Sequence, residues 1–216
     1  LQILRGTFAA ISPLCFVMAL RFVPLADAMA VSFIAPFIVT ILAATWLKER
    51  VGIHRWGAVI VGFSGTLIVI RPGFGTIHPA IFFVIIAASL FAARQILSRY
   101  LSKTDTTSTT LAYTALAGSF WLTLLIPFFW HWPVEPLHLL LFGSIAFFAA
   151  ISEIFVVKAL EITQAVVLAP VQYSLIIWGT MYGFLVFGQL PDQWTWIGAA
   201  IIIAGGCYIF YRERLT

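Results

Sequence analysis

The chain has 216 residues, of which 62% are hydrophobic, 16% aromatic and 9% charged, and its formal net charge is +4. Its mean hydropathy is +1.05, whereas soluble domains are about 45–50% apolar and about 25% charged. A water-soluble globule of this size cannot bury so much apolar surface, and a disordered chain would need more charge. The composition therefore predicts a polytopic membrane protein.

Apolar segments follow one another along the chain, separated by short polar stretches. A membrane-spanning helix needs about 20 mostly apolar residues, and segments such as 81–90 lack the alternation of a transmembrane β-strand. The sequence therefore predicts an all-α protein. Its eight transmembrane helices are expected near residues 3–21, 26–47, 54–71, 79–98, 108–130, 137–158, 164–187 and 193–211.

Positive residues are unevenly distributed between the two sides of this predicted arrangement. If successive loops alternate between sides, ten of the 12 Lys and Arg residues fall on one side, and only Arg21 and Arg71 on the other. Positive residues in short loops mark the cytoplasmic side. The pattern predicts a multi-pass protein of the inner (plasma) membrane with a cytoplasmic C-terminus. It argues against nucleic acid as a partner, because there is no soluble basic domain.

The chain resembles itself when it is shifted by 140 residues. The sequence FAAIS occurs at 8–12 and at 148–152, and Ala-Leu follows seven residues later in both copies. The shift spans five predicted helices, an odd number, so the two copies enter the membrane from opposite sides. Such inverted repeats are typical of secondary transporters. Helices four and five have no counterpart, so we expect two further helices before Leu1 and a complete ten-helix fold of two halves (5+5).

Longer sequences in both halves carry a resemblance to a known family. The first half contains ALRFVPLADAMAVSFIAPF at 19–37 and WLKERVGIHRW at 46–56, and the second contains KALEITQAVVLAP at 158–170. These sequences resemble an EamA-type transporter of the drug/metabolite transporter superfamily, and the resemblance covers essentially the whole chain. It implies that residues 1–73 are the last three helices of the first EamA-type repeat and that 77–214 are the five helices of the second.

The resemblance implies a secondary transporter that moves a small organic metabolite by alternating access. The substrate would be an amino acid, an amine metabolite such as S-adenosylmethionine, or a drug-like compound. Protons as the coupling ion and a homodimer through the last helix are further options. A membrane-embedded enzyme and a non-transporting scaffold remain alternatives, although clustered catalytic residues are absent. No paired Cys/His set and no phosphate-binding loop occur, so we expect no enzyme activity, metal or cofactor.

Glu153 is the main candidate for a functional residue. Placing a carboxylate in mid-membrane costs about 2.5–3.5 kcal/mol on insertion scales. In the sequence, Glu153 follows a stripe of small residues at helical spacing, Gly143, Ala146 and Ala150. Small residues let helices approach closely or line a cavity. Glu153 is therefore predicted to bind a substrate amine or to carry a proton. The alternative is a structural ion pair with Lys158 or Arg94 near the inner interface.

Other polar and aromatic residues within the predicted spans are candidates for the cavity wall. A serine can instead bond its own helix backbone, and an aromatic side chain can pack or face lipid. Arg94 and Gln95 are predicted to snorkel toward the interface. The cavity candidates besides Glu153 are Ser12, Ser32, Tyr113, Trp121, Gln172, Tyr173 and Trp178, and the prolines expected to kink their helices are Pro36 and Pro170.

Overall fold

The computed structural model describes residues 1–49, 51–70, 78–129, 135–164, 168, 175–188 and 192–213. Over these residues all regular secondary structure is helical, which confirms the predicted all-α character. The helices are α1 (Gln2–Ala19), α2 (Leu25–Ser32), α3 (Ile34–Thr45), α4 (Ile53–Ile70), α5 (Ile81–Leu101), α6 (Thr107–Phe129), α7 (Pro136–Ile162), α9 (Leu175–Phe187) and α10 (Gln193–Glu213).

Several of these helices are long and apolar enough to cross a membrane. Within the part of the chain that the structure describes, five stretches qualify by length and composition: Gln2–Ala19, Asp27–Thr45, Ile81–Leu101, Thr107–Phe128 and Pro136–Ile162. Helices satisfy their backbone hydrogen bonds internally, as the hydrocarbon interior requires. The chain is therefore an all-helical, multi-pass membrane protein. The total of eight spans and the 5+5 repeat stay predictions.

The second predicted span, 26–47, is interrupted. α2 ends at Ser32 and α3 begins at Ile34. Pro36 lies in the first turn of α3, where its missing N–H is tolerated because the first N–H groups of a helix have no intrahelical partner. In a continuous helix its ring would clash with the carbonyl of Ser32, four residues earlier. The position of the fully buried Pro36 therefore accounts for the interruption.

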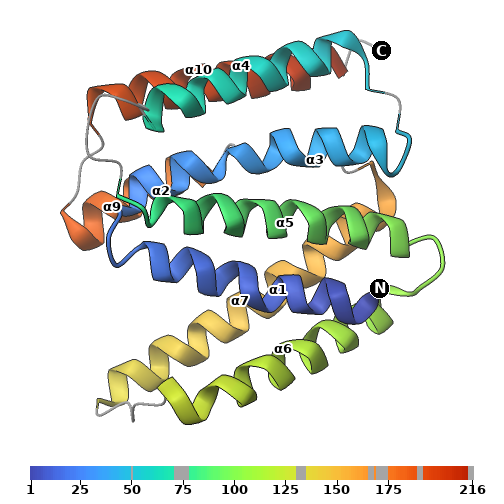
Figure 1. Cartoon of the computed structure of the whole chain (residues 1–216), viewed down its shortest axis with the longest axis vertical. Coiled ribbons are helices and arrows are strands. Elements are labelled where there is room, and N and C mark those ends of the chain that lie inside the picture. Colours follow the sequence, from blue (N-terminus) through green and yellow to red (C-terminus); the bar gives the residue numbers. More distant parts are fainter. Residues whose placement is uncertain are drawn as a thin grey trace.

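Figure 1 shows the helices lying side by side. α4 and α10 pack against each other at one end, α1 and α5 lie together in the middle, and α6 lies next to α1 at the opposite end. Two glycines permit close approaches between these helices. A Cβ at Gly65 in α4 would lie 2.8 Å from the carbonyl oxygen of Gly198 in α10, and one at Gly6 in α1 would lie 2.5 Å from Cβ of Ala117 in α6.

α5 has a central position in this arrangement. Its Ala92 and Ile96 pack with Val39 of α3 and Leu160 of α7, and all four side chains are fully buried or nearly so. Near the other end of α5, Val84 joins a second buried cluster formed mainly by the end of α1 and by α2. Because α5 contacts α1, α3 and α7, side chains on its surface can combine with those of all three helices in one site.

Candidate functional site

An ion-pair cluster joins three helices. Arg5 of α1 donates from Nη2 to Oε1 of Glu153 in α7 over 2.6 Å, and Arg94 of α5 donates from Nη1 to the other carboxylate oxygen, Oε2. The exposed fractions of the side chains are 1% for Arg5, 12% for Arg94 and 19% for Glu153. A carboxylate this far from solvent is costly unless it is paired and hydrogen-bonded. Both Glu153 oxygens meet that requirement here.

The Arg5 guanidinium uses all three of its nitrogens. Besides the bond to Glu153, Nε donates to Oγ of Ser98 in α5, and Nη1 donates to Oγ1 of Thr114 in α6. Each of these hydroxyls in turn donates to the carbonyl four residues earlier in its own helix. One fully buried side chain therefore connects α1, α5, α6 and α7.

The Arg94 guanidinium is only partly used. Its Cζ lies 5.1 Å from the centre of the Phe91 ring, one turn earlier in α5. Nη1 is bonded to Glu153, whereas Nε and Nη2 have no hydrogen-bond partner among the residues that the structure describes. The cluster contains two guanidinium groups and one carboxylate, so it carries a formal charge of +1.

The prediction that Arg94 and Gln95 snorkel is wrong for both residues. Gln95 is buried, with 3% of its surface exposed, and Arg94 turns inward because Glu153 on α7 offers it a counter-charge. Lys158, the other partner that the sequence suggests for Glu153, is exposed and has no ion pair within the described residues.

Arg5 is the cluster residue that sequence reasoning missed, because it was assigned only to the cytoplasmic charge bias. Its position already contains a signal. It lies in the first turns of an apolar helix, and an ionisable residue inside a membrane span is a functional candidate by default. Its partner could not be named from the sequence, because Arg5 and Glu153 are 148 residues apart.

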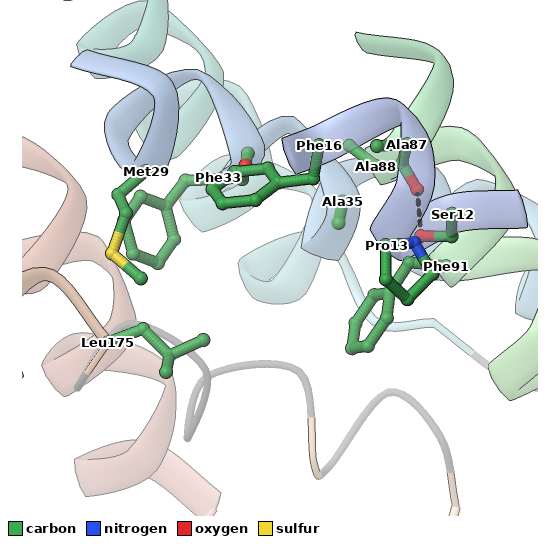
Figure 2. A pocket seen from close by; sticks show the side chains of 11 residues that line it. Ser12, Pro13, Phe16, Met29, Phe33, Ala35, Ala87, Ala88, Phe91 and Leu175 are labelled. Atoms are coloured by element: carbon green, nitrogen blue, oxygen red, sulfur yellow. Dashed lines mark hydrogen bonds between the residues drawn. The ribbon is translucent and has the colours of Figure 1, made fainter. Parts of the chain in front are cut away.

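A cavity of about 280 Å³ lies between α1, α2, α3, α5 and α9. Figure 2 shows Met29 and Leu175 toward one end of it and Ser12, Pro13 and Phe91 toward the other. Among the described residues, its lining contains three phenylalanines and no charged side chain. Ligand cavities generally measure about 300–1,000 Å³. This one is thus sized for a small apolar molecule or for one ring system of a larger one.

Two hydroxyl groups supply the polarity of the described cavity lining. Ser12 Oγ donates to the carbonyl oxygen of Ala87 in α5 over 2.9 Å, as the dashed line in Figure 2 marks. Ser32 Oγ donates to the Ala28 carbonyl of its own helix over 2.8 Å. Both hydroxyl hydrogens are therefore used within the protein. The oxygens keep a lone pair with which they can accept a hydrogen bond from a ligand.

The other predicted site residues lie apart from this cavity or outside the described residues. On α6, Trp121 donates from Nε1 to Thr7 Oγ1 over 2.9 Å, and the Tyr113 residue is 42% exposed. Trp178 on α9 is 51% exposed. A cavity role for these three residues stays a prediction. Gln172, Tyr173 and Pro170 fall outside the residues that the structure describes.

A second polar cluster lies where α3, α5 and α7 end. Nε of Arg99 lies 3.7 Å from Oε1 of Glu49, and its Nη1 donates to the carbonyls of Leu160 and Glu161. Cations are favourable near a helix C-terminus, where the last carbonyls have no intrahelical partner. Arg99 therefore has a structural use for Nη1 and a counter-charge of its own in Glu49, whereas Arg94 shares Glu153 with Arg5.

The comparisons with known proteins agree with the architecture described above. A model of the EamA-like transporter family matches residues 1–71 and 78–211. The chain belongs to the EamA-like transporter family.

Curated relatives of this EamA-family protein are transporters. It is 30% identical to the riboflavin transporter of Vibrio cholerae over 98% of this chain and 72% of the relative. It is 28% identical to the S-adenosylmethionine uptake transporter of Rickettsia prowazekii, over 99% of this chain and 72% of the relative. It is 25% identical to the pseudopaline exporter of Pseudomonas aeruginosa, over 98% of this chain and 75% of the relative. The predicted family is confirmed, and the protein is a small-metabolite transporter and not an enzyme.

The fold is also found among solved structures. One crystal structure superposes with a TM-score of 0.68 and 17% sequence identity, covering 99% of this chain and 76% of that one. At this level of identity the likeness concerns the fold alone.

Proposed function

We propose that this EamA-family protein is a secondary transporter that moves its substrate by alternating access, and that the cavity between α1, α2, α3, α5 and α9 holds the substrate. One observation carries the proposal. Of the eleven residues that line the cavity, seven, such as Phe16, lie within 1–73, and four, such as Phe91, lie within 77–214. Both predicted halves therefore contribute residues to the cavity, which supports the proposal because transporters built from inverted repeats bind their substrates between the repeats.

The substrate in this proposal is a small organic metabolite with an apolar part. The names of the relatives include riboflavin, S-adenosylmethionine and pseudopaline, and the resemblance adds amino acids and drug-like compounds. An apolar cavity with two hydroxyl groups selects for shape and apolar surface. The named relatives include both uptake proteins and an exporter, so the assay must measure both directions.

The proposed setting is the inner (plasma) membrane with the C-terminus in the cytoplasm. The ten-to-two distribution of Lys and Arg supports this orientation. The homodimer predicted through the last helix needs a surface other than Gly198 and Gly205. Gly198 lies against Gly65 of α4, and Gly205 is buried within the chain.

Protons are the coupling ion in this proposal, and Glu153 is the residue that would carry them. Its two oxygens accept bonds from Arg5 and Arg94. Proton uptake would therefore release one arginine, and that release would couple protonation to a rearrangement of α1, α5 and α7. The competing role, as partner of a substrate amine, requires the same exchange of partners.

The test is transport by the full-length protein in proteoliposomes, measured in both directions with a metabolite panel that includes riboflavin and S-adenosylmethionine. We expect saturable transport of at least one compound. Ala88→Leu, which fills the cavity from α5, should lower the rate by about tenfold, because a close-packed interior does not yield to added volume. Ala115→Leu adds the same side chain on an exposed position of α6 and should leave the rate unchanged.

Two results would contradict the proposal. If purified full-length protein still unfolds cooperatively, and is therefore folded, but transports no compound of the panel, the scaffold alternative is favoured. Equal rates for Ala88→Leu and the wild type would place the substrate elsewhere.

A further inference from the structure

We propose that Arg94 determines specificity by binding a carboxylate of the substrate, while an aromatic ring of the same substrate occupies the cavity against Phe91. The inference rests on the proposed function, because it assumes that this cavity holds the substrate. It narrows the substrate class to small molecules in which a flat apolar group and a carboxylate are joined by a short linker.

The charge balance of the ion-pair cluster is the first argument. Two guanidinium groups share the single carboxylate of Glu153. Each of the three nitrogens of Arg5 has a partner, in Ser98, Thr114 or Glu153, whereas two nitrogens of Arg94 have none among the described residues. The excess positive charge therefore resides on Arg94. A charge in a low-dielectric interior is costly without a counter-ion, and an anionic ligand would supply one.

The open donors of Arg94 are the second argument. A guanidinium binds a carboxylate best through two parallel N–H groups. Arg94 keeps Nε and Nη2 without a partner among the described residues, and these two nitrogens form one edge of the guanidinium plane. Arg5 has no edge with two unpartnered nitrogens. Arg99 already has a counter-charge, because its Nε lies 3.7 Å from Glu49 Oε1, and its Nη1 is bonded to the carbonyls at the end of α7.

The position of Phe91 is the third argument. Its ring lines the cavity and also lies under the Arg94 guanidinium, at 5.1 Å from Cζ to the ring centre. Arg94 itself is not among the described lining residues, but this contact keeps its guanidinium next to a ring that forms part of the cavity wall. A ring packed on Phe91, in an edge or offset geometry, could reach Arg94 with a carboxylate two or three bonds away.

The experiment measures direct binding of two matched probes to the purified full-length protein by equilibrium dialysis. The probes are 3-phenylpropionate and its neutral amide, which share the ring and the linker and differ in charge. We expect the wild type to bind the carboxylate at least about tenfold more tightly than the amide, the ratio expected for one charge-assisted hydrogen bond. Arg94→Gln should remove this preference, and its affinity for the amide should stay within about twofold of the wild-type value.

Four further variants separate recognition from a structural role. Arg94→Lys keeps the charge and should keep part of the preference. Arg21→Gln removes a positive charge from an exposed position and should keep all of it. Phe91→Leu should lower the affinity for both probes by the same factor, because both carry the ring that packs against Phe91. In Arg94→Gln/Glu153→Gln the carboxylate that Arg94 neutralises is removed as well, so the cluster regains its formal charge of +1 on Arg5. The preference should stay lost, whereas a purely structural Arg94 would allow it to return.

The inference is overturned if the wild type binds both probes equally or binds neither at millimolar concentration. It is also overturned if Arg94→Gln keeps the preference, or if the double variant restores it. Transport of a panel metabolite together with any of these results would leave the proposed function intact and reject only the role of Arg94. Failure of all transport would reject the proposed function itself.

Discussion

Arg5 and Glu153 form an ion pair at 2.6 Å although 148 residues separate them in the sequence. Arg5 lies in α1, which contains the first copy of FAAIS, and Glu153 lies in α7, which contains the second. The pair therefore links the two helices that the predicted inverted repeat relates to each other.

Replacement of Arg5 should destabilise the protein. Arg5→Leu removes three hydrogen bonds and leaves Ser98, Thr114 and Glu153 short of a partner. Breaking a buried pair generally costs about 3–5 kcal/mol. Arg94 still neutralises Glu153, so we expect about 2–3 kcal/mol, seen as a lower unfolding temperature in detergent. Arg21→Leu, at an exposed position, is the matched control. An unchanged unfolding temperature for Arg5→Leu would show that the cluster contributes little to stability.

Substitution of Gly65 should separate α4 from α10. A Cβ at this position would lie 2.8 Å from both the Gly198 carbonyl oxygen and Cγ1 of Ile202. The backbone oxygen cannot yield as a side chain can, so Gly65→Ala should cost about 1–3 kcal/mol. Gly143→Ala in α7 meets nothing within 4 Å and should be neutral or stabilising by up to about 1 kcal/mol, because alanine favours helix. Thermal unfolding of both variants checks this, and equal losses would argue against the close α4–α10 contact.

Glu153→Gln distinguishes the two roles predicted for this carboxylate. If Glu153 carries protons, the variant should lose accumulation driven by a proton gradient and keep counterflow exchange, which needs no net proton movement. If Glu153 binds a substrate amine, both activities should weaken, because the neutral amide loses a charge-assisted hydrogen bond of about 1.5–3 kcal/mol. We expect the first pattern. Normal activity in both assays would leave Glu153 with a structural role only.

The orientation of the protein can be tested by cysteine labelling in a variant that lacks Cys15 and Cys207. Lys103 lies between α5 and α6 on the predicted cytoplasmic side, and Arg21 follows α1 on the opposite side; both are exposed. An impermeant thiol reagent should label Arg21→Cys in intact cells and should label Lys103→Cys only after the membrane is opened. The reverse pattern would invert the proposed topology.

The amino-acid sequence by itself determined the fold class and the positions of most helices. α6 covers Thr107–Phe129 where 108–130 was expected, and α10 begins at residue 193 as predicted. This success has a local cause. A run of about 20 apolar residues in hydrocarbon needs hydrogen-bond partners for its backbone groups, and a helix supplies them from within the run itself. Family membership likewise followed from short stretches of sequence that resemble those of EamA-type transporters.

Only the tertiary structure decided which side chains meet. The sequence identified Glu153 as an unusual carboxylate, but its pairing with Arg5 depends on how α1 and α7 are rotated and on their contacts with α5 and α6. The inward turn of Arg94 and the contribution of Phe91 to the cavity wall depend on the same packing. Helix formation is set by neighbouring residues in the chain, whereas the charge and shape of a site are set by residues that folding brings together from distant helices.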